Sequence, residues 1–144
     1  MSKVKLIRDF ASLVAGEHVT IPHERSEWMM SMGEPKPRLT LPKDLNAIDA
    51  GDRQFRADFI RRCPMARGFA HVTLSILHEI GHHFNREAYL FYDDTGYEPC
   101  WVDEYDVNHY TIPYEVVATE WAIEWLKDPE HRKQAKAFER AYFA

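Results

Sequence analysis

Apolar residues recur every three or four positions in two stretches of the chain, which is the spacing of one face of an α-helix. In residues 67–85 they stand at positions 69, 72, 76, 77, 80 and 84, and this is the strongest helix prediction in the chain. A helix is also predicted over 3–15, ending before Gly16. Its broad apolar face consists of Val4, Leu6, Ile7, Phe10, Leu13 and Val14.

Two more helices are predicted from the signals at their ends. A short charged helix over 52–62 should stop at Cys63, because the residue before a proline, here Pro64, is steered away from helical geometry. Pro113 stands where a helix can begin, since its missing N–H is not needed in the first turn. The sequence YEVVATEWAIEWLK follows it without a breaker, so we expect one uninterrupted helix there.

The remaining C-terminal sequence divides into a loop and a last helix. Residues 86–112 mix many aromatic and acidic side chains without a helical period, and we expect loop with at most a short strand. Asp128 and Pro129 are typical of an N-cap and a first helical turn. We therefore predict a last helix that runs to about residue 143.

Residues 17–52 differ from the helical stretches in composition. They carry several prolines and two short alternating pieces, GEHVTIP and PRLTLP, which suit edge strands or extended loop. No repeat, low-complexity tract or linker divides the chain, so we expect one domain over 1–144. The predicted fold class is α+β, mostly helical, with a small β-sheet.

Composition narrows the classes of protein. The chain has 144 residues, 45% of them hydrophobic, which is enough for one domain with its own core. Its net charge of −5 argues against a basic stripe, so we expect no nucleic-acid partner.

No run approaches the roughly 18 apolar residues of a membrane span. Arg8 and Asp9 interrupt the first apolar run, so no signal peptide is predicted. Two cysteines, Cys63 and Cys100, form no ladder of spacings, and we expect a cytoplasmic protein with reduced thiols.

The sequence LHEIGHHFN in the strongest predicted helix carries the candidate chemistry. His78 and His82 are four residues apart, so on a helix they share one face at about 6 Å and both imidazoles can reach a single ion. Such a pair supplies two of the three protein ligands usual in a catalytic zinc site. Glu79 is offset by about 100° and stands beside the metal. In the known mechanics of His-Glu-x-x-His, that carboxylate takes a proton from a water molecule at the metal.

Gly81 supports the functional interpretation. A glycine in a helix interior costs about 1 kcal/mol relative to alanine, so its presence asks for a reason. Close approach of another element or of substrate is such a reason. The alternative interpretation is a pair of surface histidines on an amphipathic helix.

A third ligand must come from another part of the chain. The longer metallopeptidase pattern that continues to a third histidine is excluded, because positions 85 and 88 are Asn85 and Ala88. His83 points about 100° away from His82 and is interpreted as a surface or supporting residue. His71 lies on the face of His78, but two turns separate them by about 10 Å.

The helix after Pro113 offers Glu115 as the third ligand. Glu115 shares a face with Ala118, Thr119 and Ala122, and these small side chains would let this helix pack closely against the metal-bearing one. The alternative is that Glu115 is only a first-turn acid favourable to the helix dipole. Two other acids of this helix share a face with a lysine, and ion pairing in solvent explains them: Glu120 and Glu124, with Lys127.

The two helices together resemble the ImmA/IrrE family of small zinc metallopeptidases. The likeness rests on HEIGH at 78–82 and EVVATEWA at 115–122, against the family's His-Glu-x-Gly-His and Glu-x-x-Ala-Asn-x-Phe-Ala. Thr119 stands for the asparagine and Trp121 for the phenylalanine. The resemblance implies a zincin-like domain whose small sheet lies beside the metal-bearing helix. It also implies that Zn2+ is bound by His78, His82 and Glu115, with Glu79 as the general base.

Further side chains are candidates for supporting roles. An oxyanion donor could come from the residues just before the ligand helix, which are Tyr105, His109, Tyr110 and Tyr114. Cys63 could reach the zinc as a thiolate, but a packed, reduced cysteine is the default interpretation. Isolated histidines without a partner at metal spacing are expected at the surface: His18, His23 and His131.

The sequence therefore predicts a zinc-dependent metallopeptidase that hydrolyses peptide bonds with Glu79 as the base. Its expected partner is a peptide or protein substrate, and the family resemblance suggests a regulatory protein. The alternative function is a non-catalytic, zinc-stabilised protein-interaction module.

Overall fold

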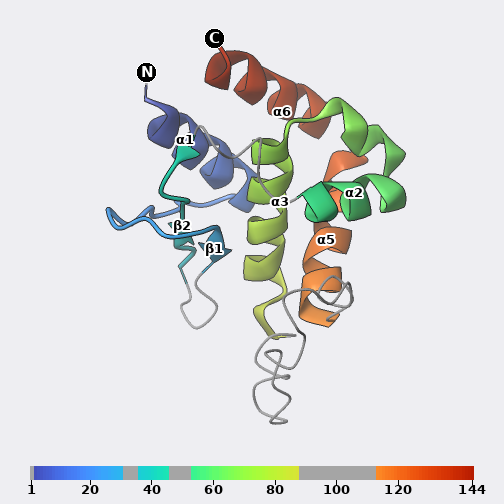
Figure 1. Ribbon diagram of the computed structural model, residues 1–144, viewed down its shortest axis with the longest axis horizontal. Helices are drawn as coiled ribbons and strands as arrows, with labels where there is room; N and C mark the ends of the chain where they lie inside the picture. The colour runs from blue at the N-terminus through green and yellow to red at the C-terminus, as the bar shows by residue number, and fades with distance from the viewer. Residues whose placement is uncertain (1, 31–35, 46–52, 88–112) are drawn as a thin grey trace.

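The computed structural model describes residues 2–30, 36–45, 53–87 and 113–144, and the described chain is mostly helical (Figure 1). Its elements in chain order are α1 (Lys3–Ala15), β1 (Met29–Met30), β2 (Leu39–Thr40), α2 (Arg53–Arg62), the 3-10 helix η2 (Pro64–Gly68), α3 (His71–Phe84), α5 (Pro113–Leu126) and α6 (Pro129–Tyr142). α3 runs through the middle, with α1 and the strands on one side, α5 on the other and α6 across its beginning (Figure 1).

Local signals explain both ends of α1. The Ser2 side chain accepts a hydrogen bond from the Lys5 N–H at 3.1 Å, which caps the first turn. Gly16 adopts a left-handed φ of 74°, and its N–H reaches back to the Ser12 carbonyl at 2.9 Å. The predicted bounds are confirmed. The predicted apolar face is wrong at Leu13, which is 54% exposed, because α1 packs on α3 and α6 through Ile7, Phe10, Ala11, Val14 and Ala15.

The strands form a small antiparallel pair. Met30 stands opposite Leu39 in the β1–β2 register. The pieces predicted as strand or extended loop do pair, through an isolated parallel bridge between Thr20 and Arg38. β1 lies against α3, so the pair stands beside the helix that carries the histidines. The prediction for 86–112 falls almost wholly outside the described residues.

α3 is surrounded by the rest of the described chain. Every residue of α3 before Phe84 is buried, and Phe84 itself is 48% exposed, so its place on the predicted apolar face is wrong. The predicted start at 67 is also wrong. Pro64–Gly68 forms η2, and Phe69 is extended before α3 begins. Arg56 fixes this connection by donating a hydrogen bond to the Phe69 carbonyl at 2.6 Å.

The remaining helices follow their predicted signals. α2 stops before Cys63 as expected, and α5 begins at Pro113. The Asp128 side chain accepts a hydrogen bond from the Glu130 N–H at 2.9 Å and so caps α6. α6 joins the core by stacking Phe138 on Phe10 of α1, with ring centroids 4.5 Å apart. Among the described residues, no helix is long and apolar enough to cross a bilayer.

Candidate metal centre

The centre lies where α3 and α5 run antiparallel side by side (Figure 1). Gly81 is the point of closest approach. A Cβ at this position would fall on the Ala118 carbonyl oxygen and within 3.0 Å of its carbonyl carbon. The expected reason for this glycine, close approach of another element, is therefore confirmed. Ala118 and Ala122 are fully buried, so small side chains on both helices let the backbones meet.

The structure brings the three predicted ligands together at this contact. His78 Nε2 lies 3.1 Å from one Glu115 carboxylate oxygen, and His82 Nε2 lies 2.9 Å from the other. One ligand atom from each residue falls within 4.8 Å of the other two. The side chains are 8%, 6% and 18% exposed in that order, so the group is largely shielded from water. These positions permit all three side chains to hold one metal ion.

Two neighbours hold the His78 ring in place. The Thr119 hydroxyl lies 3.0 Å from His78 Nδ1, and both residues are buried. The Phe55 ring meets the imidazole edge-on, with ring centroids 5.1 Å apart. A hydrogen bond at Nδ1 leaves Nε2 turned toward Glu115 and His82, and supporting bonds of this kind are typical of metal-binding histidines. The donor set of two imidazoles and a carboxylate matches catalytic zinc, so the residues fit that ion.

Glu79 is a second buried carboxylate beside this group. It accepts a hydrogen bond from the Met30 backbone N–H of β1, the strand that lies against α3. Burial raises the pKa of Glu79, while the nearby imidazoles of His78 and His82 pull it down. The result is a carboxyl group that takes up a proton more readily than an exposed glutamate does.

The charges of the ligand group are coupled. Burial alone would raise the pKa of Glu115, but hydrogen bonds from His78 and His82 outweigh it and hold that pKa well below its usual range. Burial alone would lower the pKa of His82, yet its hydrogen bond to Glu115 raises it. A metal cation bound by the two imidazoles would neutralise the charge of the Glu115 carboxylate, as the imidazole protons do without it.

Of the two interpretations of His83, a surface residue or a supporting residue, the first is wrong. It is 4% exposed, not a surface residue, because α3 is covered on all sides by its neighbours. Its Nε2 lies 3.9 Å from a Glu17 carboxylate oxygen, while its buried Nδ1 has no hydrogen-bond partner among the described residues. Burial lowers the pKa of His83, and the charge of Arg86 lowers it further.

The other candidates divide into three groups. Tyr114 lies next to the centre, with its ring centroid 6.0 Å from that of His82. Cys63 is buried in the core and is not part of the metal-capable group, as the default interpretation expected. Glu124 pairs with Lys127 at 2.6 Å in solvent, also as expected. Three candidates lie outside the described residues: Tyr105, His109 and Tyr110.

Two contributors to the centre were not predicted. The Thr119 hydroxyl was counted only as a small residue of the packing face, although its place one turn after Glu115 is the signal that could have identified it. No signal in the sequence pointed to the Met30 N–H, because strand pairing decides which backbone donors face α3.

Comparison of the chain with models of known protein families, with curated proteins and with solved structures finds no match.

Proposed function

We propose that this protein is a zinc-dependent metallopeptidase in which His78, His82 and Glu115 hold Zn2+ and Glu79 is the general base. The observation that supports this most strongly is geometric. Two imidazole nitrogens converge within 3.1 Å of the largely buried Glu115 carboxylate, and the buried carboxylate of Glu79 stands beside them. Three buried ionisable side chains of α3 and one largely buried carboxylate of α5 meet here, and such groups are rarely gathered inside a protein without a function for them.

Zinc, when bound, would polarise a peptide carbonyl and make a water molecule more acidic. The chain supplies the remaining functions. Glu79 would accept the proton of the attacking water and pass it to the leaving amine, and its raised pKa suits a group that must hold a proton for part of the cycle. The Met30 N–H of β1 bonds to that carboxylate and stabilises its charged form.

The resemblance to the ImmA/IrrE peptidases is part of the proposal. Its support is that the two matching segments, 78–82 and 115–122, lie on helices that pack together through Gly81 and Ala118. A zincin-like domain is proposed on the same ground, with β1 beside α3 as the small sheet. We propose a regulatory protein as the substrate.

Metal content tests the ligand assignment. The protein, purified without added metal, would be measured by elemental mass spectrometry as wild type, His82→Ala, Glu115→Ala and His18→Ala. We expect near one zinc per chain in the wild type and in the exposed-residue control His18→Ala, and loss of zinc from the other two. A wild type that takes up no zinc even when incubated with it would contradict the proposal.

Glu79→Gln tests the catalytic role. Glutamine has nearly the same shape as glutamate, and residue 79 is not one of the three proposed zinc ligands. The zinc content of this variant should therefore match that of the wild type. Cleavage of a fluorogenic peptide library should fall by at least about a hundredfold, because a positioned general base contributes that much or more. Wild-type rates in this variant would show that the mechanism is wrong.

A second candidate function is a zinc-stabilised interaction module without catalysis. One observation favours it: Glu79 is buried and bonded to the Met30 N–H, as a purely structural carboxylate would be. In that case the wild type would bind zinc, cleave none of the peptides, and lose stability in Glu79→Gln. Zinc binding together with Glu79-dependent cleavage supports the enzyme.

A further inference from the structure

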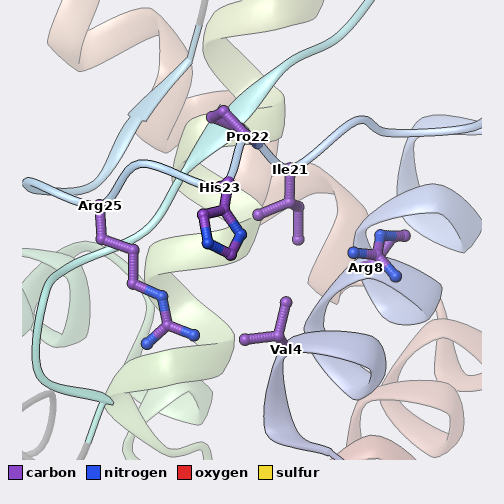
Figure 2. A pocket seen from close by; sticks show the side chains of 6 residues that line it. All are labelled: Val4, Arg8, Ile21, Pro22, His23 and Arg25. Carbon is purple, nitrogen blue, oxygen red and sulfur yellow. The ribbon is translucent and has the colours of Figure 1, made fainter.

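A hollow of about 400 Å3 lies between α1 and the extended segment 21–25, and none of its lining residues belongs to the metal centre. Figure 2 shows its lining in two parts. Val4 and Arg8 come from α1, and the rest come from the segment that follows it. The ring of His23 stands between the side chains of Arg25 and Ile21 (Figure 2). The described residues that line it are Val4, Arg8, Ile21, Pro22, His23 and Arg25.

The charge of this hollow opposes that of the chain. Among the described residues, two arginines and a histidine line it and no acid does, although the net charge of the protein is −5. Neither Arg8 nor Arg25 has a hydrogen-bond or ion-pair partner within 2–30, 36–45, 53–87 and 113–144. By contrast, Lys5, one turn earlier on α1, is paired with Asp9 at 2.7 Å. The guanidinium donors of the hollow are therefore available to an outside anion.

The rest of the lining is apolar. Val4 and Ile21 are half-buried and point toward each other, and Pro22 adds a rigid wall (Figure 2). A guanidinium presents parallel N–H donors that match a phosphate or a carboxylate. Apolar walls of this kind recognise the carbon skeleton attached to such a group, and the volume falls within the range of small-molecule pockets.

We propose that this hollow binds a small organic anion, a phosphate or carboxylate group on a short apolar body, held by Arg8 and Arg25. The ligand differs from a peptide substrate, and its site is separate from the zinc ligands. A phosphate and a carboxylate would be bound by the same guanidinium groups, so one probe of each kind is needed to distinguish them.

Isothermal titration of the full chain with four probes tests the proposal. Phenyl phosphate and benzoate carry the two anions on the same ring, benzyl alcohol lacks the charge, and inorganic phosphate lacks the ring. We expect saturable binding of at least one of the aromatic anions at millimolar concentration, and the tighter of the two identifies the anion. Benzyl alcohol and inorganic phosphate should bind at least about tenfold more weakly, because each lacks half of the recognition.

Variants locate the binding. Arg8→Gln and Arg25→Gln should each weaken it by about tenfold or more, since each removes charge-assisted hydrogen bonds. Arg140→Gln, an exposed arginine of α6 outside the hollow, is the matched control and should bind as the wild type does. His82→Ala should also keep full affinity, which separates this site from the metal centre.

Three results would overturn the proposal. The first is no binding of either aromatic anion at millimolar concentration. The second is equal affinity in the wild type, Arg8→Gln and Arg25→Gln. The third is inorganic phosphate binding as tightly as phenyl phosphate, which would remove the organic body from the recognition. Circular dichroism of each variant confirms that the fold is retained.

Discussion

Two glutamates from distant helices reach α3 near its opposite ends. At its start, Glu139 of α6 accepts hydrogen bonds from the Ala70 N–H at 2.7 Å and from the Thr73 hydroxyl at 2.5 Å. Ala70 cannot cap the helix with its own side chain, so a residue 69 positions away supplies the missing acceptor. The positive end of the helix dipole favours this carboxylate further.

Toward the other end of α3, Glu115 of α5 meets two imidazoles instead of backbone and hydroxyl donors. The partners of Glu139 keep their protons at any ordinary pH, whereas an imidazole nitrogen can bind a metal ion in place of a proton. A glutamate therefore caps α3 permanently at one end, whereas at the other end a glutamate can bind either protonated imidazoles or a metal ion. Only the second end should respond to metal and pH.

The largest expected effect is on the packing that holds Glu115 in place. Gly81→Ala should reduce the free energy of unfolding by about 3 kcal/mol, because the new Cβ meets the backbone of Ala118, which no side-chain rotation can relieve. Zinc content should fall as well. Urea denaturation and elemental analysis measure both. Gly68→Ala is the control: within the described chain its Cβ meets only Lys136 Nζ, at 4.0 Å, so the free energy of unfolding should change by no more than about 0.5 kcal/mol. Equal stability of the two variants would disprove the close contact.

The next largest effect, on stability without loss of zinc, distinguishes Glu139 from Glu115. Glu139→Ala should reduce the free energy of unfolding by about 2 kcal/mol, because it leaves the donors of Ala70 and Thr73 unpaired at the start of a buried helix. Its zinc content should match the wild type, unlike that of Glu115→Ala. Glu130→Ala, at an exposed ion pair of α6, should change stability by no more than about 0.5 kcal/mol. Loss of zinc from Glu139→Ala would show that the two ends are not independent.

Thr119→Val is a smaller change at the metal end. It keeps the shape of the side chain but removes the hydroxyl that lies 3.0 Å from His78 Nδ1. Zinc affinity, measured by competition with a chelator, should fall about tenfold, a loss typical of supporting hydrogen bonds to metal ligands. Thr119→Ser retains the hydroxyl and should stay close to the wild type. If the Thr119→Val and Thr119→Ser variants bind zinc equally well, the hydroxyl does not orient His78.

The smallest effect is the pH dependence of the metal end. The pKa of Glu115 is lowered, so its contribution to stability is present above its usual value of 4.5 and is lost as the pH falls through its lowered pKa. The pKa of His82 is raised, so its contribution is present below 6.5 and is lost as the pH rises through its raised pKa. The raised pKa of Glu79 acts in the same direction as that of His82.

Chelator-treated protein should therefore become less stable as the pH rises above 6.5. Zinc binding requires neutral imidazoles, so the stabilisation by zinc should grow over the same interval, with affinity rising about tenfold per pH unit for each proton released. Thermal unfolding from pH 5 to pH 8, with and without zinc, measures both trends. In Glu115→Ala the difference between the two curves should vanish, and its persistence would place the metal elsewhere.

Local chemistry explains why most helix bounds could be predicted. Gly16, Pro64, Pro113 and Pro129 act through their own backbone geometry, and Asp128 acts through a side-chain hydrogen bond to a residue two positions away, so none of them depends on the rest of the fold. The His78, His82 and Glu115 group was also predictable, because helical periodicity places the two histidines on one face and small residues mark the contact on the other helix. Gly81 was the strongest local sign of that contact.

The wrong predictions concern the burial of single residues and one end of a helix. Leu13 and Phe84 have the right spacing but face solvent, while His83 is polar and buried. Periodicity shows which residues share a face, and it cannot show how many faces of α3 are covered. The start of α3 was wrong because Arg56 and Glu139, both on other helices, hydrogen-bond the backbone of residues 69 and 70, and periodicity does not reveal such contacts.

The sequence by itself determined the helices with strong end signals, the histidine pair and the glutamate most suited to join it, because each depends on residues within a few turns. The tertiary structure alone decided that Thr119 supports His78, that the Met30 N–H reaches Glu79 and that Arg8 and Arg25 line one hollow. Hydrogen bonds and charge pairs act over a few ångströms, so they exist only once packing has brought distant segments together.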